Sequence, residues 1–292
     1  MASYVIAALA AAMTSALLGL RSLTRVRGLA AADPSASAVL VTGCSSGIGL
    51  DTAQALAARG VTVFATVRKD ADAEMLRAKA GENVVPLLCD VAVQADIAAL
   101  LDKVQAELEA RPTLRLTGVV NNAGVLKKDP DELSSAVLEQ IVAVNLLGVY
   151  RLTETFLPLL HKAGSAQHGA ARVVNIGSYF GSFLAGAEVP SYSATKYALE
   201  PLSDGLRRRL SHKGIHVALV KPGNIATDMN QKYAEGPASD VTDAILHALF
   251  SAAPMTRYYP GKFGGLPTRL ACWLFSALPD RLADALWKRS MG

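Results

Sequence analysis

Short apolar runs alternate with longer amphipathic segments along most of this chain. The apolar runs read AVLVTG, VTVFATV, NVVPLLCDV, LTGVVNNAG, ARVVNIGS and IHVALVKPG, and a segment with helical spacing of its apolar positions separates each run from the next. Strands that are apolar throughout are typical of a parallel sheet that is buried on both faces. The pattern therefore predicts an α/β fold, a doubly wound parallel sheet with helices on both faces.

The beginning of the chain differs from this pattern. Residues 1–20 carry no charge, and Arg21, Arg25 and Arg27 follow them directly. As a helix, residues 4–20 would span ~26 Å, at the short end of what crosses a bilayer core. We favour a membrane anchor, whose arginines would keep the rest of the chain in the cytoplasm. The alternatives are an organelle transit peptide, which is also rich in alanine and arginine, and a buried core helix.

A short linker separates this segment from the rest of the chain. Residues 30–37, AADPSASA, are small or polar, which is typical of a linker. We therefore divide the chain into two parts. Residues 1–37 form an apolar anchor or targeting segment with its linker, and residues 38–292 form a single domain with a C-terminal extension.

Composition narrows the classes of function. The chain has 292 residues, 51% hydrophobic and 18% charged, and its net charge of +4 is spread along the sequence apart from the cluster at residues 207–209. Charge distributed in this way does not indicate a nucleic-acid partner. Cys44, Cys89 and Cys272 show no metal-ligand spacing, and the histidines form no cluster. We expect free thiols in a reducing compartment and no metal site.

A glycine-rich loop, TGCSSGIG, joins the first predicted strand to the first helix. Gly43, Gly47 and Gly49 allow the backbone to turn tightly and to approach a phosphate, and the amides at the start of the helix point at the anion. Such loops also occur for structural reasons alone. Here a strand precedes the loop, and a helix and a second strand follow it, which is the context of a dinucleotide site.

The end of the second strand distinguishes the two nicotinamide cofactors. An acidic side chain there accepts hydrogen bonds from ribose hydroxyls, whereas a cation accommodates the 2′-phosphate of NADP. The sequence reads ATVRKD at this place, with Arg68 and Lys69 before the first acid, Asp70. We therefore expect NADP(H) over NAD(H), with Ser45 as a further phosphate contact. The alternative is that Arg68 is an ordinary exposed arginine at a strand end.

Four polar residues are placed in a way that suits hydride transfer. Ser178 ends the fifth strand, Tyr192 and Lys196 open the next helix one turn apart, and Asn145 lies in the helix after the fourth strand. Reduction of a ketone needs a proton donor, and a tyrosine with an ordinary pKa of about 10 is poorly matched to neutral pH. A nearby ammonium, together with the positive charge of oxidised nicotinamide, favours the phenolate and lowers that pKa, so the spacing indicates that Lys196 tunes Tyr192.

Taken together, these motifs resemble the short-chain dehydrogenase/reductase family over roughly residues 38–228. The resemblance rests on TGCSSGIG, on NNAG at residues 121–124, on the serine of IGS, on YSATK, and on PGNIAT at residues 222–227. Five motifs in the family's order make a chance match very improbable. The resemblance implies a Rossmann-type catalytic domain for residues 38–292.

The resemblance also implies a role for each candidate residue. Ser178 polarises the substrate carbonyl, Tyr192 acts as acid or base, Lys196 also contacts the ribose, and Asn145 orders a water molecule of a proton relay. Asp90 stands at the position that contacts adenine. The cofactor-binding residues implied in this way are Gly43, Ser45, Ser46, Gly47, Ile48, Gly49, Arg68, Asp90, Asn122, Ala123, Gly124, Tyr192, Lys196, Pro222, Gly223, Ile225 and Thr227.

Two features lie outside the motifs. Pro201 cannot donate a backbone hydrogen bond, so we expect a kink in the helix beyond the catalytic pair. The C-terminal region is rich in leucine and aromatic residues. One interpretation is that these residues pack against the sheet, which we favour slightly; the other is that Trp273 and Phe275 line an apolar substrate cleft or touch a membrane.

The C-terminal region and the stretch SDGLRRRLSHKGIHVALVKPG resemble the subgroup that includes retinol and 17β-hydroxysteroid dehydrogenases. Members of this subgroup are commonly membrane-associated and act on lipid-like alcohols and ketones. We therefore expect an NADP(H)-preferring oxidoreductase that interconverts a small hydrophobic alcohol and its ketone or aldehyde by hydride transfer. The resemblance further implies a homodimer, and a place at the endoplasmic reticulum membrane with the catalytic domain in the cytoplasm; the alternative locations are a plastid or a mitochondrion.

Two rival functions share the expected fold. The first is a 3-oxoacyl-thioester reductase of organellar lipid synthesis. The second is a dinucleotide-binding scaffold without catalytic activity. A scaffold would be marked by the loss of the serine, the tyrosine or the lysine, and all three are present as Ser178, Tyr192 and Lys196.

Overall fold

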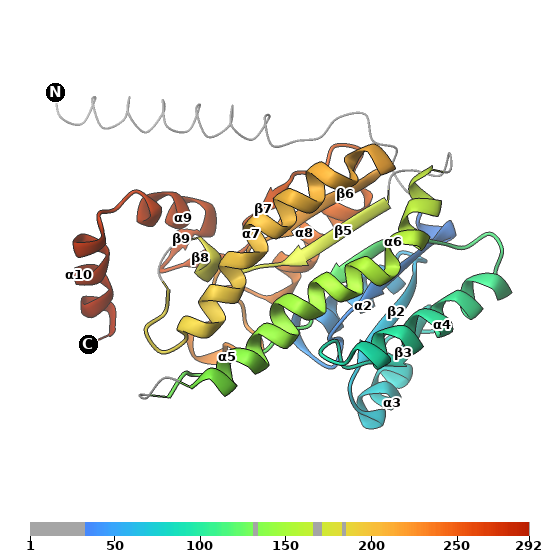
Figure 1. Cartoon of the computed structure of the whole chain (residues 1–292), viewed down its shortest axis with the longest axis horizontal. Helices are drawn as coiled ribbons and strands as arrows, with labels where there is room; N and C mark the ends of the chain where they lie inside the picture. The colour runs from blue at the N-terminus through green and yellow to red at the C-terminus, as the bar shows by residue number, and fades with distance from the viewer. Residues whose placement is uncertain (1–32, 131–133, 166–170, 183–184, 292) are drawn as a thin grey trace.

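The computed structural model describes residues 33–130, 134–165, 171–182 and 185–291. A seven-stranded parallel sheet lies between two layers of helices (Figure 1). The strand order is β3-β2-β1-β4-β5-β6-β7, so the direction in which strands are added reverses between β1 and β4. Sheets of this kind bind ligands beside that reversal, at the carboxyl ends of the strands. The predicted doubly wound sheet is confirmed. The predicted anchor lies in residues 1–32, outside the described residues.

The strands occupy the predicted apolar runs. Alternate residues of β1 enter the two cores, with Val39 and Val41 on one face of the sheet and Ala38 and Leu40 on the other. This alternation explains why an inner strand is apolar at most positions on both of its faces. The strands are β1 (Ser37–Val41), β2 (Thr62–Val67), β3 (Val84–Leu88), β4 (Arg115–Asn121), β5 (Ala171–Ile176), β6 (Ile215–Val220) and β7 (Arg257–Tyr258).

The two edge strands differ from the sequence prediction. Strand β3 is only partly buried, because it has a neighbour on one side alone. Strand β7 was not predicted, since its two residues are too few to form a recognisable apolar run. The predicted linker also ends earlier than expected. Its last residues form the 3₁₀ turn η1 (Pro34–Ala36), and Ser37 already belongs to β1.

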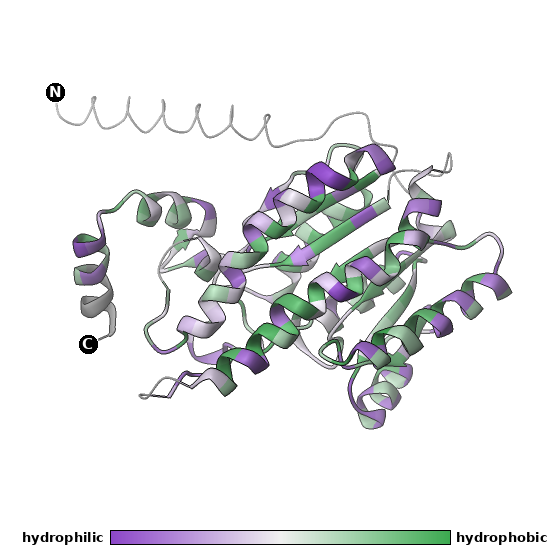
Figure 2. Cartoon of the chain, in the orientation of Figure 1, coloured by the Kyte–Doolittle hydropathy of each residue, from purple (hydrophilic) through white to green (hydrophobic). Residues whose placement is uncertain are grey.

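Helices cover both faces of the sheet, and Figure 2 shows apolar residues concentrated in the strands and on the helix sides that face them. One layer contains helices that pack on the core around Val39. The other packs on the core around Leu40. The first layer comprises α2 (Gly47–Ala57), α3 (Asp70–Lys79) and α8 (Ala238–Phe250), and the second α4 (Gln94–Ala110), α5 (Ser135–Val142), η2 (Ala143–Gly148), α6 (Val149–Ser165) and α7 (Pro190–Leu210).

Helix α7 contains the catalytic candidates and is one continuous helix of 21 residues that includes Pro201. Packing beyond the proline is intact, because Ser203 accepts a hydrogen bond of 3.0 Å from the Asn175 amide of β5, and Leu210 is buried. The proline lies on the exposed side of the helix. The missing backbone hydrogen bond is therefore on the side that water reaches.

Within the described part of the chain, one helix has the length and apolar composition that could cross a membrane. It runs from Ser135 to Ser165, and its most apolar stretch of 18 residues has a mean hydropathy of 1.3. It consists of α5, η2 and α6 joined end to end. Leu152, Phe156 and Leu160 of this helix are fully buried in the core beneath it. Packing on the sheet thus accounts for its apolar face.

The C-terminal extension lies to one side of the sheet, beside α7 (Figure 1). It contains the hairpin β8 (Lys262–Phe263) and β9 (Leu266–Pro267), helix α9 (Thr268–Ser276) and helix α10 (Asp280–Met291). Phe275 of α9 packs edge-on against Phe263, with ring centroids 5.8 Å apart, whereas Trp273 is 49% exposed. Phe275 therefore packs in a small separate cluster with the hairpin and not against the two cores of the sheet, and Trp273 lies at the surface.

Candidate active site

A cavity of about 380 Å³ opens at the carboxyl ends of the strands. The loops that follow strands β1 to β6, together with the start of α7, supply its lining. All of the predicted site residues except Gly49 and Asn145 line this cavity. Those two residues lie directly behind it and act on the lining residues, as the contacts below indicate.

The glycine-rich loop has the geometry that a dinucleotide phosphate requires. Gly43 and Gly47 adopt positive φ angles of 71° and 55°, which other residues rarely adopt. A Cβ on Gly49 would lie 2.2 Å from the carbonyl oxygen of Gly43, so the helix can approach the loop only with glycine there. The first turn of α2 contains no acidic residue that would repel an anion. The loop and helix therefore fit a nicotinamide dinucleotide.

The NNAG segment after β4 holds this loop in place. The side-chain amide of Asn122 donates to the carbonyl oxygens of Thr42, at 2.8 Å, and Gly43, at 3.2 Å. In return, the hydroxyl of Thr42 accepts from the backbone N–H groups of Asn122 and Ala123, at 3.0 and 2.9 Å. A Cβ on Gly43 would lie 2.9 Å from the Cα of Ala123, so the two loops are in backbone contact.

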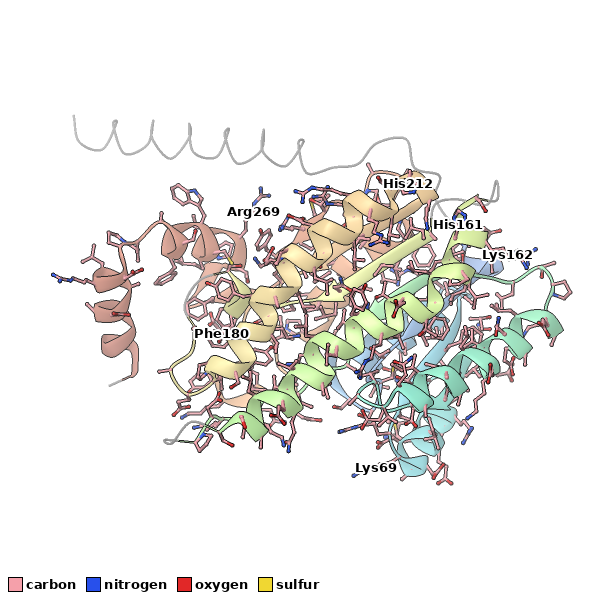
Figure 3. The ribbon with its side chains drawn as sticks, viewed as in Figure 1. Lys69, His161, Lys162, Phe180, His212 and Arg269 are labelled. Carbon is pink, nitrogen blue, oxygen red and sulfur yellow. The ribbon has the colours of Figure 1, made fainter. Side chains whose placement is uncertain are left out.

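The residues that follow β2 and β3 border another part of the cavity. Arg68 lines it and is exposed, with Lys69 beside it as the first residue before α3 (Figure 3). Asp90 also lines it, and one of its carboxylate oxygens accepts from the backbone N–H of Ala92 at 2.9 Å. The structure therefore places one cation, Arg68, and one carboxylate, Asp90, at this part of the cavity, whereas Lys69 lies outside the lining.

The three central catalytic candidates meet at the ends of β5 and α7. The hydroxyl of Tyr192 is hydrogen-bonded to Ser178, and the Ser178 hydroxyl also accepts from the backbone N–H of Phe180 at 3.2 Å. The ammonium of Lys196 donates to the carbonyl oxygen of Ile176 at 2.8 Å and lies 5.6 Å from the centre of the Tyr192 ring. All three side chains border one small volume of the cavity.

Burial controls the protonation of this pair. It raises the pKa of Tyr192 to about 12, although the hydrogen bond with Ser178 acts in the opposite direction. It lowers the pKa of Lys196 to about 8, because an ammonium is costly to hold away from water. The lowered pKa that the sequence predicts for Tyr192 includes the positive charge of oxidised nicotinamide and stays a prediction. Tyr192 and Lys196 are both less than one-tenth exposed, and for Tyr192 this burial acts against a lowered pKa.

Asn145 lies within the π-helical turn η2, a rare feature that is frequent at functional sites. Its side chain bonds Val125 twice, accepting from the backbone N–H at 2.8 Å and donating to the carbonyl oxygen at 2.9 Å. A Cβ on Gly124 would lie 3.4 Å from the oxygen of Asn145 and 3.7 Å from the nitrogen of Lys196. Both side chains therefore converge behind Gly124.

The PGNIAT segment closes the cavity from the end of β6. Pro222 accepts a hydrogen bond of 3.1 Å from the backbone N–H of Tyr179, which ties the segment to the residue after Ser178. A Cβ on Gly223 would lie 2.2 Å from the carbonyl oxygen of Lys262. Ile225 and Thr227 line the cavity beyond it.

An aromatic and apolar wall was not predicted from the sequence. Tyr179 and Phe180 follow Ser178 directly and line the cavity, with ring centroids 4.3 Å apart. The ring of Phe180 meets that of Tyr192 edge-on at 6.3 Å, beside α7 (Figure 3). Their position one and two residues after the predicted serine was the available signal. Further lining residues outside the predicted set include Val125, Leu126, Val144, Asp228, Met229 and Asn230.

No group of three or more histidine, cysteine, aspartate or glutamate side chains with the arrangement of a metal site occurs among the described residues. Cys44, Cys89 and Cys272 are buried and free. Burial raises the pKa of the Cys89 thiol to about 12, so it is not a reactive thiolate.

Comparison with known proteins gives the family. The profile of the family described as short chain dehydrogenase matches residues 37–238. Rat (Rattus norvegicus) retinol dehydrogenase 7 is 33% identical over 294 residues, covering 85% of this chain and 86% of the relative. Human (Homo sapiens) 17-beta-hydroxysteroid dehydrogenase type 6 is 31% identical over 298 residues, covering 86% and 88%. The uncharacterized oxidoreductase YbbO of Escherichia coli (strain K12) is 33% identical over 270 residues, covering 85% and 93%.

Solved structures agree with this result at the level of the fold. A 3-ketoacyl-(acyl-carrier-protein) reductase from Brucella melitensis, complexed with NADH, superposes with a TM-score of 0.70 at 22% identity and covers 80% of this chain and 98% of its own. A short chain dehydrogenase from Burkholderia cenocepacia, in complex with NADP, gives 0.69 at 24% identity, covering 87% and 97%. The chain belongs to the short-chain dehydrogenase/reductase family, and it is an NAD(P)-dependent oxidoreductase acting on CH–OH groups.

Proposed function

We propose that this enzyme prefers NADP(H) and interconverts a lipid-like alcohol of the steroid or retinoid type and its ketone or aldehyde. The observation that carries the proposal is the meeting of Ser178, Tyr192 and Lys196 beside the aromatic rings of Tyr179 and Phe180 in one cavity. The first three are polar groups suited to proton transfer, and the rings offer an apolar surface to a flat hydrophobic substrate.

Each polar residue has a distinct task in this proposal. Ser178 donates a hydrogen bond to the substrate oxygen and orients it. Tyr192, whose pKa of about 12 keeps the phenol protonated at neutral pH, gives its proton to that oxygen during reduction. Lys196, held by the carbonyl of Ile176, stabilises the phenolate that remains. The bound nicotinamide supplies the hydride for reduction and accepts it in oxidation.

Asn145 supports proton exchange with solvent in this scheme. Its carboxamide is fully buried and converges with Lys196 behind Gly124. A water molecule ordered there would pass a proton to Tyr192 through Lys196. Such a relay would restore the phenol after each reduction.

The preference for NADP(H) rests on charge. Arg68 and Lys69 follow the end of β2, where a 2′-phosphate would lie, and no acidic residue lies between β2 and Asp70. Ser45 adds a hydroxyl to the same region of the cavity lining. The remaining cofactor contacts are those of the glycine loop, NNAG and PGNIAT segments described above.

The substrate class rests on two independent supports. Rat retinol dehydrogenase 7 and human 17-beta-hydroxysteroid dehydrogenase type 6, both named for lipid-like alcohols, are 33% and 31% identical to this chain. The cavity wall beside Ser178 is aromatic and apolar. A hydrophobic substrate partitions into bilayers, so membrane association through residues 1–20 at the endoplasmic reticulum, with a cytoplasmic catalytic domain, completes the proposal.

An assay with a panel of carbonyl compounds tests this function. Purified enzyme is supplied with NADPH or NADH and with all-trans-retinal, steroid ketones, a 3-oxoacyl thioester and simple ketones. We expect the highest kcat/KM for a retinoid or steroid with NADPH. Preference for the thioester would support the rival reductase of lipid synthesis instead and would contradict the proposal.

A further inference from the structure

Glu235 joins two chain segments on the substrate side of the cavity. One carboxylate oxygen accepts from the side-chain amide of Asn224 at 2.7 Å and from the backbone N–H of Gly264 at 2.8 Å. The other accepts from the backbone N–H of Gly265 at 2.6 Å. Gly264 and Gly265 form the turn of the β8–β9 hairpin (Figure 1) and both have positive φ, which lets successive N–H groups point at one carboxylate.

The first of these segments is a loop that reaches into the cavity. Its two ends are joined, because the N–H groups of Glu235 and Gly236 donate to the carbonyl of Asn224, at 2.8 and 3.1 Å. Met229 and Asn230, near the tip of the loop, line the cavity. We define residues 228–236, which follow the cofactor-binding candidates Ile225 and Thr227, as the substrate loop. Glu235 fastens the base of this loop to the hairpin.

The same carboxylate also determines the orientation of a buried amide. Asn224 is 7% exposed; its amide donates to Glu235, and its oxygen accepts from the Tyr179 hydroxyl at 3.1 Å. Tyr179 in turn packs on Phe263 of the hairpin, with ring centroids 4.7 Å apart. A chain of contacts therefore runs from Glu235 through Asn224 to the aromatic wall next to Ser178.

An ionised carboxylate suits these contacts, because every group that faces it is a donor. Partial burial would raise the pKa of Glu235, but the hydrogen bonds from Gly265, Asn224 and Gly264 outweigh it and hold the pKa below its ordinary value. A glutamine at this position would direct its NH₂ group at one of those donors. Because Asn224 is buried, the loss of its acceptor would be costly even though Glu235 itself lies at the surface.

We propose that Glu235 is a positioning residue that fixes the substrate loop and Tyr179, and thereby sets the affinity for the carbonyl substrate rather than the chemistry or the cofactor affinity. The inference rests on the proposed function for its substrate side. Glu235 does not line the cavity, but in this proposal it determines the shape of the wall that recognises the substrate.

The test compares Glu235→Gln with Glu235→Asp, and with Glu109→Gln as a control at an exposed glutamate of α4. Hydrogen–deuterium exchange is measured over residues 228–236 and 262–267, NADPH affinity by fluorescence titration, and KM and kcat with the best carbonyl of the panel. For Glu235→Gln we expect faster exchange in both segments, KM raised about tenfold, and kcat and NADPH affinity within about twofold of the wild type. The exchange rates and KM of Glu235→Asp should lie between those of Glu235→Gln and the wild type, and those of Glu109→Gln should match the wild type.

Unchanged exchange in Glu235→Gln would overturn the proposal, and so would an unchanged KM or a loss confined to kcat. Failure of the proposed function has a different signature. In that case the wild type turns over no retinoid or steroid, while a thioester or another carbonyl supplies the KM comparison. If no carbonyl is turned over, the proposed function fails; faster exchange in Glu235→Gln would still support the positioning role of Glu235, and unchanged exchange would overturn it.

Discussion

At the scale of single residues, Tyr192 and Lys196 are governed by their removal from water. The phenol is held protonated and the amine is brought close to deprotonation at neutral pH. Their separation of one helical turn places them together, but burial determines which form each of them takes. Tyr192 therefore holds the proton that reduction requires, and the positive charge that develops on the nicotinamide would favour its release.

Lys196 carries a cost in stability that its removal should reveal. Its pKa is about 8 when folded and 10.5 in an accessible lysine, so between these values the unfolded chain binds the extra proton and stability rises with pH. Thermal unfolding followed from pH 7 to 10 should show this rise. At pH 7, Lys196→Met should have an unfolding midpoint a few degrees above that of the wild type. Its stability should rise less between pH 7 and pH 10, because the titration of Lys196 is absent. Its turnover should fall by orders of magnitude. A control, Lys79→Met at an exposed site, should leave the profile unchanged; a lower midpoint for Lys196→Met at pH 7 would refute the assignment of a buried cation.

Arg68 should determine which cofactor is used. Replacing it with glutamate places a carboxylate where the 2′-phosphate would lie and where ribose hydroxyls can bond instead. We expect Arg68→Glu to lower kcat/KM for NADPH by at least about tenfold and to change that for NADH little or to raise it. Equal losses with both cofactors would contradict a role for Arg68 in recognising the phosphate.

At the scale of elements, the glycine loop, NNAG and α2 form one unit that depends on close backbone approach. A Cβ on Gly49 would overlap the carbonyl of Gly43 and the side-chain amide of Asn122. That amide donates a hydrogen bond to the Gly43 carbonyl and so holds the loop in place. No atom lies within 4 Å of a Cβ built on Gly205, which is exposed within α7. These two helical glycines thus provide a matched pair.

We expect Gly49→Ala to weaken NADPH binding strongly and to destabilise the fold, because the clash involves backbone atoms that cannot move aside. Gly205→Ala should instead raise stability by up to about 1 kcal/mol, since alanine is the better helix former. Fluorescence titration with NADPH and thermal unfolding of both variants measure the difference. A Gly49→Ala protein with wild-type NADPH affinity would show that the close approach is not needed.

The elements also show why some features were predictable from the sequence and others were not. Gly43, Ser178 and Tyr192 were found because strand ends and helix starts are marked by local pattern, and parallel strands bring those ends together. The burial of Tyr192 and Lys196 was not predicted, because spacing reports a neighbour but not its exclusion from water. Glu235 was missed because its partners in the β8–β9 hairpin are distant in sequence and no motif joins them.

At the scale of the whole molecule, the sheet with its two cores buries ionisable groups that have no catalytic task. His216 of β6 lies opposite Arg172 of β5, and both are almost fully buried. Burial lowers the pKa of His216 to about 4, and the positive charges of Arg172 and Arg207 act in the same direction, against the hydrogen bond to Met255. The histidine is therefore neutral in the folded protein at neutral pH.

His216 should contribute to acid sensitivity. Its folded pKa lies below the ordinary 6.5, so the unfolded chain takes up the proton first and stability is lost as the pH falls from about 6.5 toward 4. Between pH 7 and pH 4.5, the free energy of unfolding should fall by roughly 2 to 3 kcal/mol less in His216→Gln than in the wild type, as measured by urea unfolding. His212→Gln, at an exposed histidine, is the control (Figure 3). Equal acid sensitivity in the wild type and His216→Gln would show that other groups are responsible.

The central claim concerns the whole enzyme at work: the buried phenol of Tyr192 gives its proton to a hydrophobic carbonyl compound while NADPH is consumed. The most direct measurement compares NADPH oxidation by the wild type and Tyr192→Phe with the best retinoid or steroid carbonyl, after equal NADPH binding has been established by fluorescence. We expect turnover to fall by two to four orders of magnitude in Tyr192→Phe, with cofactor binding preserved. Turnover within a few fold of the wild type would contradict the account.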